Sequence, residues 1–224
     1  MKGKVNLAKY ETLIFILEGS LLNEKVAEQN ALRQTLKLTG REYGPAERIQ
    51  YNSLQEKTKL LGFDERIKLT LQEFFINDWI SAKGTFYNQL QKQDQLNKDV
   101  VPFLDEVKNQ VNLVLLTKEK KDVASYRMQN TELINYFSAV YFKDDFACNF
   151  PNKKVLTTIL QQQNLTPATC LVIGTNLVDE IQCAENANLD SLWLAPKKVK
   201  MPISPRPTLH LNKLTDLLFY LELS

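Results

Sequence analysis

The sequence has few of the residue types that many functional sites need. It contains one histidine, His210, which nearly excludes histidine-based catalysis or metal binding, and we expect it to be a strand or loop residue within Thr208–Leu211. It has only 7 glycines, although loops that bring their backbone close to a ligand usually contain glycine. Its cysteines, Cys148, Cys170 and Cys183, are odd in number and lack a paired spacing, which is typical of free thiols in a reducing compartment.

A strong net charge and a long apolar segment are also missing. The 28 basic and 26 acidic residues leave a formal net charge of +2, which gives no reason to expect nucleic acid or an anionic membrane as a partner. Residues 1–9 contain no apolar run long enough for a signal peptide, and no segment approaches the length of a membrane span. We therefore expect a cytoplasmic protein that binds neither nucleic acid nor membrane.

What the sequence does contain is an alternation of apolar strands and amphipathic helices. Thr12–Leu17 (TLIFIL) is an apolar run followed closely by Gly19, which predicts a buried strand. From Val100 onward strand and helix patterns alternate, which predicts an α/β fold with a parallel sheet and helices on both faces. The other predicted strands are Val111–Leu116, Ala139–Phe142, Cys170–Ile173 and Ser191–Leu194, and the predicted helices are Val100–Val111, Lys153–Gln163, Val178–Ala187 and Leu211–Leu221.

The stretch from Leu21 to about Leu96 has apolar residues at helical spacing and no run that is typical of a strand. We expect residues 1–20 and 97–224 to form the α/β core, and residues 21–96 to form an all-helical cap over the strand ends. Helix breaks are predicted near Gly40–Pro45, Gly62 and Gly84. The cap is rich in aromatic residues, most of which should lie in its core: Phe63, Phe74, Phe75, Trp79, Phe86 and Tyr87.

Ligand-binding residues are expected at three strand ends, because open parallel sheets bind ligands beyond the carboxyl ends of their strands. These ends are Ile16–Ser20, Thr117–Lys118 and Gly174–Asn176. The segments around them resemble, in order and spacing, the motifs of the haloacid dehalogenase (HAD) superfamily. Tyr10–Asn23 resembles the first motif, Asp-x-Asp-Gly-Thr, and Leu116–Lys118 the second, while Pro151–Leu156 resembles the stretch after the third-motif lysine and Ile173–Ile181 the fourth motif, Gly-Asp-Ser followed by an acid.

The resemblance covers nearly the whole chain and implies a HAD-like, Rossmann-like parallel-sheet core with an inserted helical cap. The Pro-Asn-Lys-Lys run that begins at Pro151 and the tail Pro207–Leu221 most resemble the branch that contains noncanonical pyrimidine nucleotidases. The mechanism that the resemblance implies uses an Asp nucleophile, a second carboxylate as general acid and base, a bound Mg²⁺ and a lysine.

Several positions that match these catalytic residues hold other side chains. Ile16 stands at the nucleophile and has no lone pair with which to attack phosphorus. Glu18 stands at the general acid and base, Thr175 at the Asp that holds Mg²⁺, and Phe150 at the lysine. Thr117 keeps the hydroxyl of the second motif. The resemblance therefore implies a degenerate site with no intact catalytic residue and no cofactor, Mg²⁺ being expected only with residual activity.

Hydroxyls and backbone N–H groups at these strand ends could still bind a small phosphorylated ligand or another anion. The candidates are Glu18, Gly19, Ser20, Thr117, Lys118 and Asn176. No metal site is expected, and the weak candidates for one are Glu18, Asp179 and Glu180, the last two being typical acids of a first helical turn. We expect Lys118, Lys153 and Lys154 to be solvated.

Three functions stay open at this point. The first is a pseudoenzyme that acts by binding a ligand or a protein. The second is a weakly active phosphatase or nucleotidase that uses Glu18 and a displaced nucleophile. The third is a structural subunit whose cap mediates homodimerisation. A metal in the site would favour the enzyme, and a solvent-facing cluster of cap aromatics would favour an interaction role.

Overall fold

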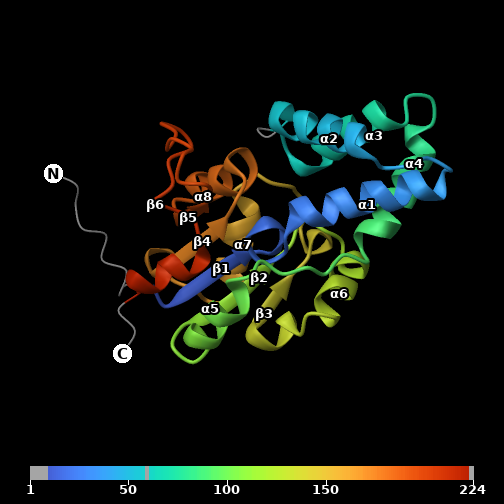
Figure 1. Ribbon diagram of the computed structural model, residues 1–224. Helices are drawn as coiled ribbons and strands as arrows, with labels where there is room; N and C mark the ends of the chain where they lie inside the picture. The colour runs from blue at the N-terminus through green and yellow to red at the C-terminus, as the bar shows by residue number, and fades with distance from the viewer. Residues whose placement is uncertain (1–9, 59–60, 222–224) are drawn as a thin grey trace. The chain divides into compact units, whose positions relative to one another are not determined.

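The computed structural model describes residues 10–58 and 61–221, and the chain divides into two compact units (Figure 1). The first, here called the sheet unit, comprises the described residues up to Leu22 and from Leu96 onward. The second, here called the helical unit, comprises those of Asn23–Gln95.

The sheet unit contains a six-stranded parallel sheet with the strand order β3-β2-β1-β4-β5-β6. The strands are β1 (Thr12–Ile16), β2 (Asn112–Leu116), β3 (Ala139–Tyr141), β4 (Cys170–Gly174), β5 (Asp190–Leu194) and β6 (Leu209–Leu211). The α-helices of this unit are α5 (Val100–Val107), α6 (Lys121–Gln129), α7 (Lys154–Gln162) and α8 (Gln182–Asn186). The strand order changes direction at β1, so the carboxyl ends of β1, β2 and β4 lie next to each other, where such sheets bind ligands.

Both faces of the sheet are buried, which explains why β1 is a continuous apolar run. Successive side chains of a strand point to opposite faces, and Leu13 and Phe15 accordingly pack with residues of α5 and α6. Ile14 and Ile16 pack on the other face with residues of α7 and α8. The predicted α/β fold with a parallel sheet and helices on both faces is confirmed.

The helical unit consists of α1 (Glu24–Leu38), α2 (Pro45–Thr58), α3 (Phe63–Phe74) and α4 (Trp79–Leu90), and its described residues form no strand. The cap aromatics lie in its core: four are buried, and Trp79 and Tyr87 pack against them half-buried. The predicted helix break at Gly84 is wrong, because α4 runs through it. A lone glycine costs a helix only about 1 kcal/mol, and the buried Ala82 and Phe86 anchor α4 on both sides of it.

Two predicted helices of the sheet unit are also wrong in part. The sequence predicts one helix over Leu211–Leu221, but Leu211 ends β6 and only Leu214–Phe219 is helical, as a short 3-10 helix. Pairing with β5 buries Leu211, and this tertiary contact overrides the helical pattern at the start of the predicted helix. His210 is a strand residue, one of the two conformations predicted for it. Val178–Ala187 is divided into a wide helical turn, Leu177–Ile181, and the short α8.

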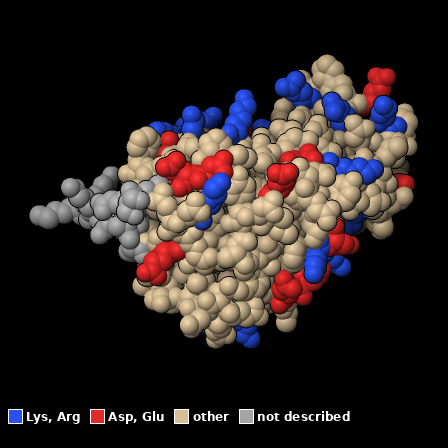
Figure 2. Space-filling view, turned by 90° about the horizontal axis from the view of Figure 1, so that it is seen from below, with Lys and Arg blue, Asp and Glu red and all other residues tan. Residues whose placement is uncertain are grey.

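Lysine and arginine side chains and acidic side chains both occur on the face shown in Figure 2, in several places next to each other. None of the helices in residues 10–58 and 61–221 is long and apolar enough to cross a membrane.

Candidate functional site

The turn that follows β1 holds Glu18 just beyond the carboxyl end of that strand. Gly19 has a φ of 82°, a left-handed conformation that glycine adopts without strain, and a Cβ there would overlap the Thr175 hydroxyl. The Ser20 hydroxyl donates to the Ile16 carbonyl, and the Gly19 N–H donates to the Leu22 carbonyl over 3.1 Å. The turn is therefore stabilised by its own hydrogen bonds, and Gly19 lies in close contact with Thr175, directly after β4.

Asn97 also fixes this turn, although no motif in the sequence pointed to it. Its side-chain amide donates to the carbonyls of Gly19 and Ser20 over 2.7 and 3.2 Å, and its backbone N–H donates to Leu21 over 2.8 Å. Asn97 lies close to the point where the chain re-enters the sheet unit, and that position was the only signal in the sequence.

The Glu18 carboxylate faces the end of β2. It is 3% exposed and accepts hydrogen bonds from the Thr117 hydroxyl and, over 3.0 Å, from the Lys118 N–H. The Thr117 hydroxyl in turn accepts from the Glu119 N–H over 3.1 Å. Buried carboxylates need such partners, and here they come from the chain itself.

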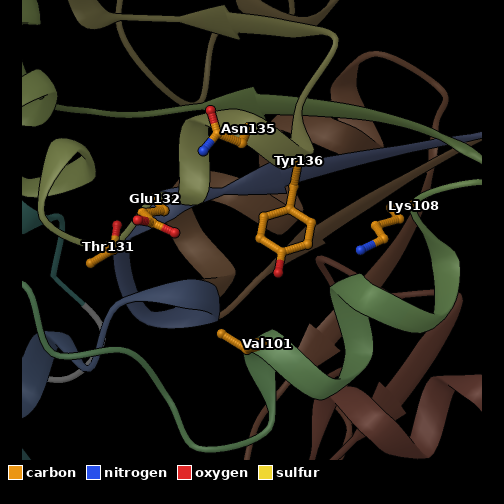
Figure 3. Close-up of a pocket in the computed structure, with 6 residues that line it drawn as sticks. All are labelled: Val101, Lys108, Thr131, Glu132, Asn135 and Tyr136. Atoms are coloured by element: carbon orange, nitrogen blue, oxygen red, sulfur yellow. The ribbon is translucent and has the colours of Figure 1, made fainter.

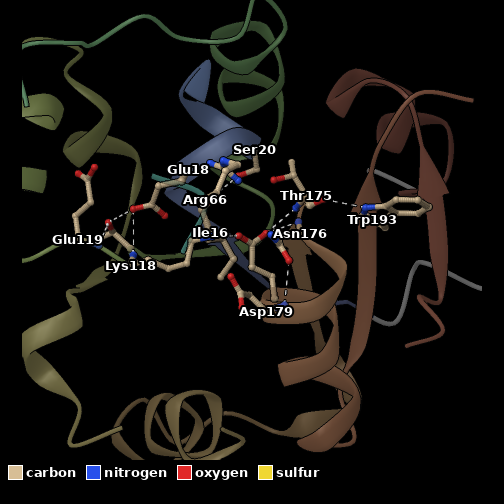
Figure 4. Close-up of polar contacts among 12 residues, drawn as sticks. Ile16, Glu18, Ser20, Arg66, Lys118, Glu119, Thr175, Asn176, Asp179 and Trp193 are labelled. Atoms are coloured by element: carbon tan, nitrogen blue, oxygen red, sulfur yellow. Dashed lines mark hydrogen bonds and ion pairs between the residues drawn. The ribbon is translucent and has the colours of Figure 1, made fainter. Parts of the chain in front are cut away.

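The prediction that Lys118 is solvated is wrong, because its ammonium forms a buried ion pair with Glu180. Figure 4 shows Lys118 beside Glu18, to which its backbone N–H donates. The side chain of Glu180 is fully buried, and its second oxygen accepts from the N–H groups of Thr175 and Asn176 over 2.7 and 3.0 Å. Burial disfavours the ammonium, but the carboxylates of Glu180 and Glu18 outweigh this and raise the pKa of Lys118 above its ordinary value. The expectation of a solvated Lys118 fails for a physical reason. A buried carboxylate without a cation is costly, and the Lys118 ammonium can reach Glu180.

A second buried ion pair lies beside the first. The Arg127 guanidinium, on α6, is fully buried and pairs with Glu119, two residues after Thr117. The backbone carbonyl of Glu119 accepts from the Lys143 N–H over 3.0 Å. Neither residue was singled out from the sequence: Glu119 follows the second motif but lies outside it, and Arg127 stands in a charged helical stretch with no motif around it.

The end of β1 is apolar. Ile16 is 0% exposed and packs in a cluster with Val114, Leu116 and Tyr141. Phe150 is half-buried and packs against the same cluster. Lys153 and Lys154, which could have replaced a missing lysine, are exposed near the start of α7. Two of the degenerate positions therefore share one apolar environment, while Glu18 and Thr117 share a hydrogen bond and Gly19 lies against Thr175.

The Thr175 backbone is held from a further side. The indole N–H of Trp193, on β5, donates to the Thr175 carbonyl over 2.9 Å, and the Trp193 ring stacks on His210 with centroids 4.5 Å apart. Asn176 caps the next turn by accepting from the Asp179 N–H over 3.0 Å. Asn176 and Asp179 thus have a structural hydrogen bond to each other, although Asn176 was a candidate for ligand binding and Asp179 a candidate for metal binding.

The residues present do not fit a Mg²⁺ ion, which is usually bound through carboxylate oxygens. Ile16 and Thr175 offer no charge, and one oxygen of Glu18 and both oxygens of Glu180 accept hydrogen bonds from donors of the chain. Within the described part of the chain, no group of three or more His, Cys, Asp or Glu side chains is placed to hold a metal ion.

A surface pocket with a volume of about 320 Å³ lies elsewhere in the sheet unit (Figure 3). Lys108 and Tyr136, which contribute to its lining, stand just before β2 and β3, so the pocket belongs to the amino ends of these strands. The candidate site residues belong to the opposite, carboxyl ends. The pocket is therefore not the predicted site.

The chain is similar to proteins of known name and structure over nearly its whole length. It is 25% identical over 228 residues to the pyrimidine 5'-nucleotidase PynA of Streptococcus pneumoniae, with 95% of both chains covered. It is 21% identical to the HAD-hydrolase YfnB of Bacillus subtilis, with 97% of both covered. The crystal structure of YfnB bound to magnesium superposes with a TM-score of 0.84 at 20% identity and covers 96% of this chain and 99% of its own.

A second solved structure shows the same fold at a greater distance. The β-phosphoglucomutase-like protein of Thermotoga maritima superposes with a TM-score of 0.71 at 17% identity, covering 90% of this chain and 94% of its own. Residues 13–194 match the family of haloacid dehalogenase-like hydrolases, and this match includes the ends of β1, β2 and β4. The resemblance that the motifs predicted is confirmed, and the chain belongs to the haloacid dehalogenase-like hydrolase family.

Proposed function

We propose that this chain is a haloacid dehalogenase-like protein that does not hydrolyse phosphate esters and acts by binding, with a protein as its partner. The observation that carries the proposal is Ile16, which is fully buried in an apolar cluster at the position that matches the nucleophile. A hydrocarbon side chain cannot form a bond to phosphorus. Phe150, at the position that matches the lysine, packs against the same cluster and supplies no positive charge.

A small anion is disfavoured as the ligand, because the donors of the site are already used. The Thr117 hydroxyl, the Lys118 N–H and the Lys118 ammonium donate to Glu18 or Glu180, and the Thr175 and Asn176 N–H groups donate to Glu180. A phosphate would have to displace two buried carboxylates, which would then lose their hydrogen bonds. The three cysteines are free thiols, which supports a cytoplasmic location.

A weak phosphatase or nucleotidase is the second candidate. It is favoured by the full-length similarity to a pyrimidine 5'-nucleotidase and by the carboxylate of Glu18, which keeps the charge of the general acid and base. A general base needs a nucleophile to deprotonate. Glu18 instead accepts from Thr117 and the Lys118 backbone.

Steady-state assays on a panel of sugar phosphates and nucleotides, with Mg²⁺ and with a chelator, separate the two candidates. The proposal predicts no phosphate release above background under either condition. It also predicts that inorganic phosphate does not raise the unfolding temperature. Chelator-sensitive turnover of any of these esters would establish the phosphatase instead.

A further inference from the structure

A loop with a concentration of positive charge lies between β5 and β6, and it is the red loop beside these labels in Figure 1. We call residues 196–206 the basic loop; their sequence, PKKVKMPISPR, contains four basic residues. Residues 191–215 as a whole contain five Lys or Arg residues and no Asp or Glu, so the rest of the chain has more acids than bases. The net charge of +2 therefore hides a local excess of cations.

The cations of the basic loop are not neutralised by the chain itself. All four are exposed, and within residues 10–58 and 61–221 none of them forms an ion pair with an acid: Lys197, Lys198, Lys200 and Arg206. Lys108, by contrast, is also on the surface and pairs with Asp105 over 2.8 Å. Ammonium and guanidinium groups without an internal partner remain available to the carboxylates of another molecule.

Apolar side chains stand between these cations. Ile203 is 95% exposed, the largest exposed fraction among the large apolar side chains of the described residues, and Val199 and Met201 are also exposed. A single exposed aliphatic side chain is ordinary on a protein surface. Three within five residues, beside four cations, instead suit a partner that offers both aliphatic and acidic side chains, because an interface combines apolar contacts with a charged rim.

The carboxyl end of the loop is fixed to the fold. Glu185, on α8, accepts from the Arg206 N–H over 3.0 Å and from the Ser204 hydroxyl over 3.4 Å. Pro205 and Pro207 are buried. Glu185 offsets at most one of the four positive charges. A segment that is already anchored and contains prolines loses less conformational freedom when it binds, which favours binding.

We propose that the basic loop is the surface by which this chain binds its protein partner, and that the partner presents an acidic segment with aliphatic side chains. The inference rests on the proposed function, in which a protein is the partner, and it adds the surface and the chemistry of that partner. Glutamates or aspartates of the partner pair with the lysines of the loop, and an aliphatic side chain covers Ile203.

Other anionic surfaces fit the loop less well. Single-stranded nucleic acids are usually bound by stacking bases on aromatic side chains, and residues 196–206 contain none. Stable attachment to a membrane needs two signals, such as a lipid chain and a polybasic patch, and Ile203 is a small anchor in comparison. A second copy that offered its acidic surface would make a head-to-tail contact, which forms open chains unless its rotation closes a ring.

The test is fluorescence anisotropy of two labelled peptides with the full-length protein. In the first peptide glutamates flank two central leucines, and in the second glutamate replaces both leucines. The wild type should bind the leucine peptide about 10-fold more tightly than the all-glutamate peptide. Higher salt should weaken the binding of both, because it screens the charges of an exposed surface.

Two variants of the loop separate the contributions of charge and apolar contact. The combined change Lys197→Gln, Lys198→Gln, Lys200→Gln should weaken the binding of both peptides by about 30-fold. Ile203→Ser should weaken only the leucine peptide, by about 10-fold, and leave the all-glutamate peptide unchanged. All four side chains are exposed, so both variants should keep the far-ultraviolet circular dichroism of the wild type.

Matched controls change the same residue types at other exposed positions. Lys153→Gln with Lys154→Gln removes two adjacent lysines, and Ile76→Ser removes an isoleucine that is 78% exposed. Neither control should change the affinity for either peptide. Vesicles of phosphatidylserine and phosphatidylcholine, a DNA oligomer, and sedimentation of the protein alone test the other three surfaces.

Binding of the leucine peptide that falls in both loop variants and in neither control supports the inference. It is overturned by a lack of binding, by equal wild-type affinity for the two peptides, or by equal losses in the controls. Tighter binding to vesicles or DNA, or self-association, that the lysine variant abolishes also overturns it. Phosphate release is measured separately: an inactive chain that ignores the peptides contradicts only this inference, and an active chain that binds them contradicts only the proposed lack of activity.

Discussion

The ends of β1 and β4 lie side by side in the sheet but have opposite chemical character. The end of β1 is apolar: Ile16 packs with residues of both neighbouring strands, and Phe150 covers the same cluster. The end of β4 leads into a buried polar network in which Glu180 binds Lys118 and two backbone N–H groups. One strand end has lost the groups that could react, and the other has its polar groups satisfied within the chain.

The difference teaches that a site can be closed in two ways. The apolar Ile16 stands where the reacting group would be. The ion pair of Lys118 and Glu180 occupies polar groups that a ligand would otherwise contact. Removing one member of the ion pair would leave a buried charge without a partner, which is costly. Together the two changes give a site without a reacting group at Ile16 and with the charges of Lys118 and Glu180 paired.

The largest effect is expected when the apolar end of β1 is given a charge. Ile16→Asp places a carboxylate among hydrocarbon side chains and should lower the free energy of unfolding by about 3–5 kcal/mol. Ile16→Val, the matched control, should cost about 1 kcal/mol. Urea unfolding of both variants measures the difference. A charged variant as stable as the control would show that the end of β1 is open to water.

The second effect concerns the polar end of β4. Glu180→Gln leaves a buried ammonium, and a double-mutant cycle with Lys118→Met should give a coupling free energy of about 2–3 kcal/mol. The pKa of Lys118 is raised in the folded protein, so this contribution is complete below about pH 10 and is lost as the pH rises through the folded pKa. The cycle is therefore measured near neutral pH. The exposed pair of Lys108 and Asp105 should show no measurable coupling, and an equal value for both pairs would remove the contrast.

A smaller effect is expected at Glu18. In Glu18→Gln the side-chain carbonyl can still accept from Thr117 and Lys118, so the loss of charge should cost about 1 kcal/mol. The catalytic background should not change, because Glu18 has no nucleophile to serve. If Glu18→Gln lowers the free energy of unfolding as much as Glu180→Gln does, the buried polar network depends on Glu18, after β1, as strongly as on Glu180, after β4.

The smallest effect is on the rate of thiol alkylation, and it involves no loss of protein stability. The two buried thiols of the apolar cluster, Cys170 and Cys183, should react slowly with an alkylating reagent. Burial raises the pKa of Cys183 to about 12 and that of Cys170 to about 11. Both stay protonated at pH 8, whereas the half-buried Cys148 should be alkylated first. Peptide mapping after brief alkylation identifies the modified residue. Since both pKa values are raised, the thiols contribute stability below about pH 8.5 and lose it as the pH rises toward 12. Rapid labelling of Cys183 would contradict a tightly packed cluster.

Motif order and strand patterns allowed much of the sheet and the positions of its strand ends to be predicted. Ile16, Thr117 and Thr175 could be placed from sequence because each directly ends or follows an apolar run. The closing strand Leu209–Leu211 could not be distinguished from a loop, because three residues carry too little periodicity and pairing with β5 decides their conformation.

The polar partners were harder to predict than the strand ends. Lys118 and Glu180 are 62 residues apart, and a lysine next to a motif is as compatible with solvent as with a buried acid. Arg127 and Asn97 likewise acquire their roles only when the chain is folded. Side-chain pairing of this kind depends on distances in space that no local pattern encodes.

The central claim is that no group at the end of β1 can attack a phosphate ester. Phosphate release from pyrimidine nucleoside monophosphates in Mg²⁺ tests it most directly, with the wild type compared with Ile16→Asp, Glu18→Gln and the triple variant Ile16→Asp, Thr175→Asp, Phe150→Lys. Catalytic groups act as a unit, so we predict that the wild type and Ile16→Asp remain at background and that only the triple variant can gain activity. Wild-type turnover that a chelator stops and Glu18→Gln abolishes would contradict the account.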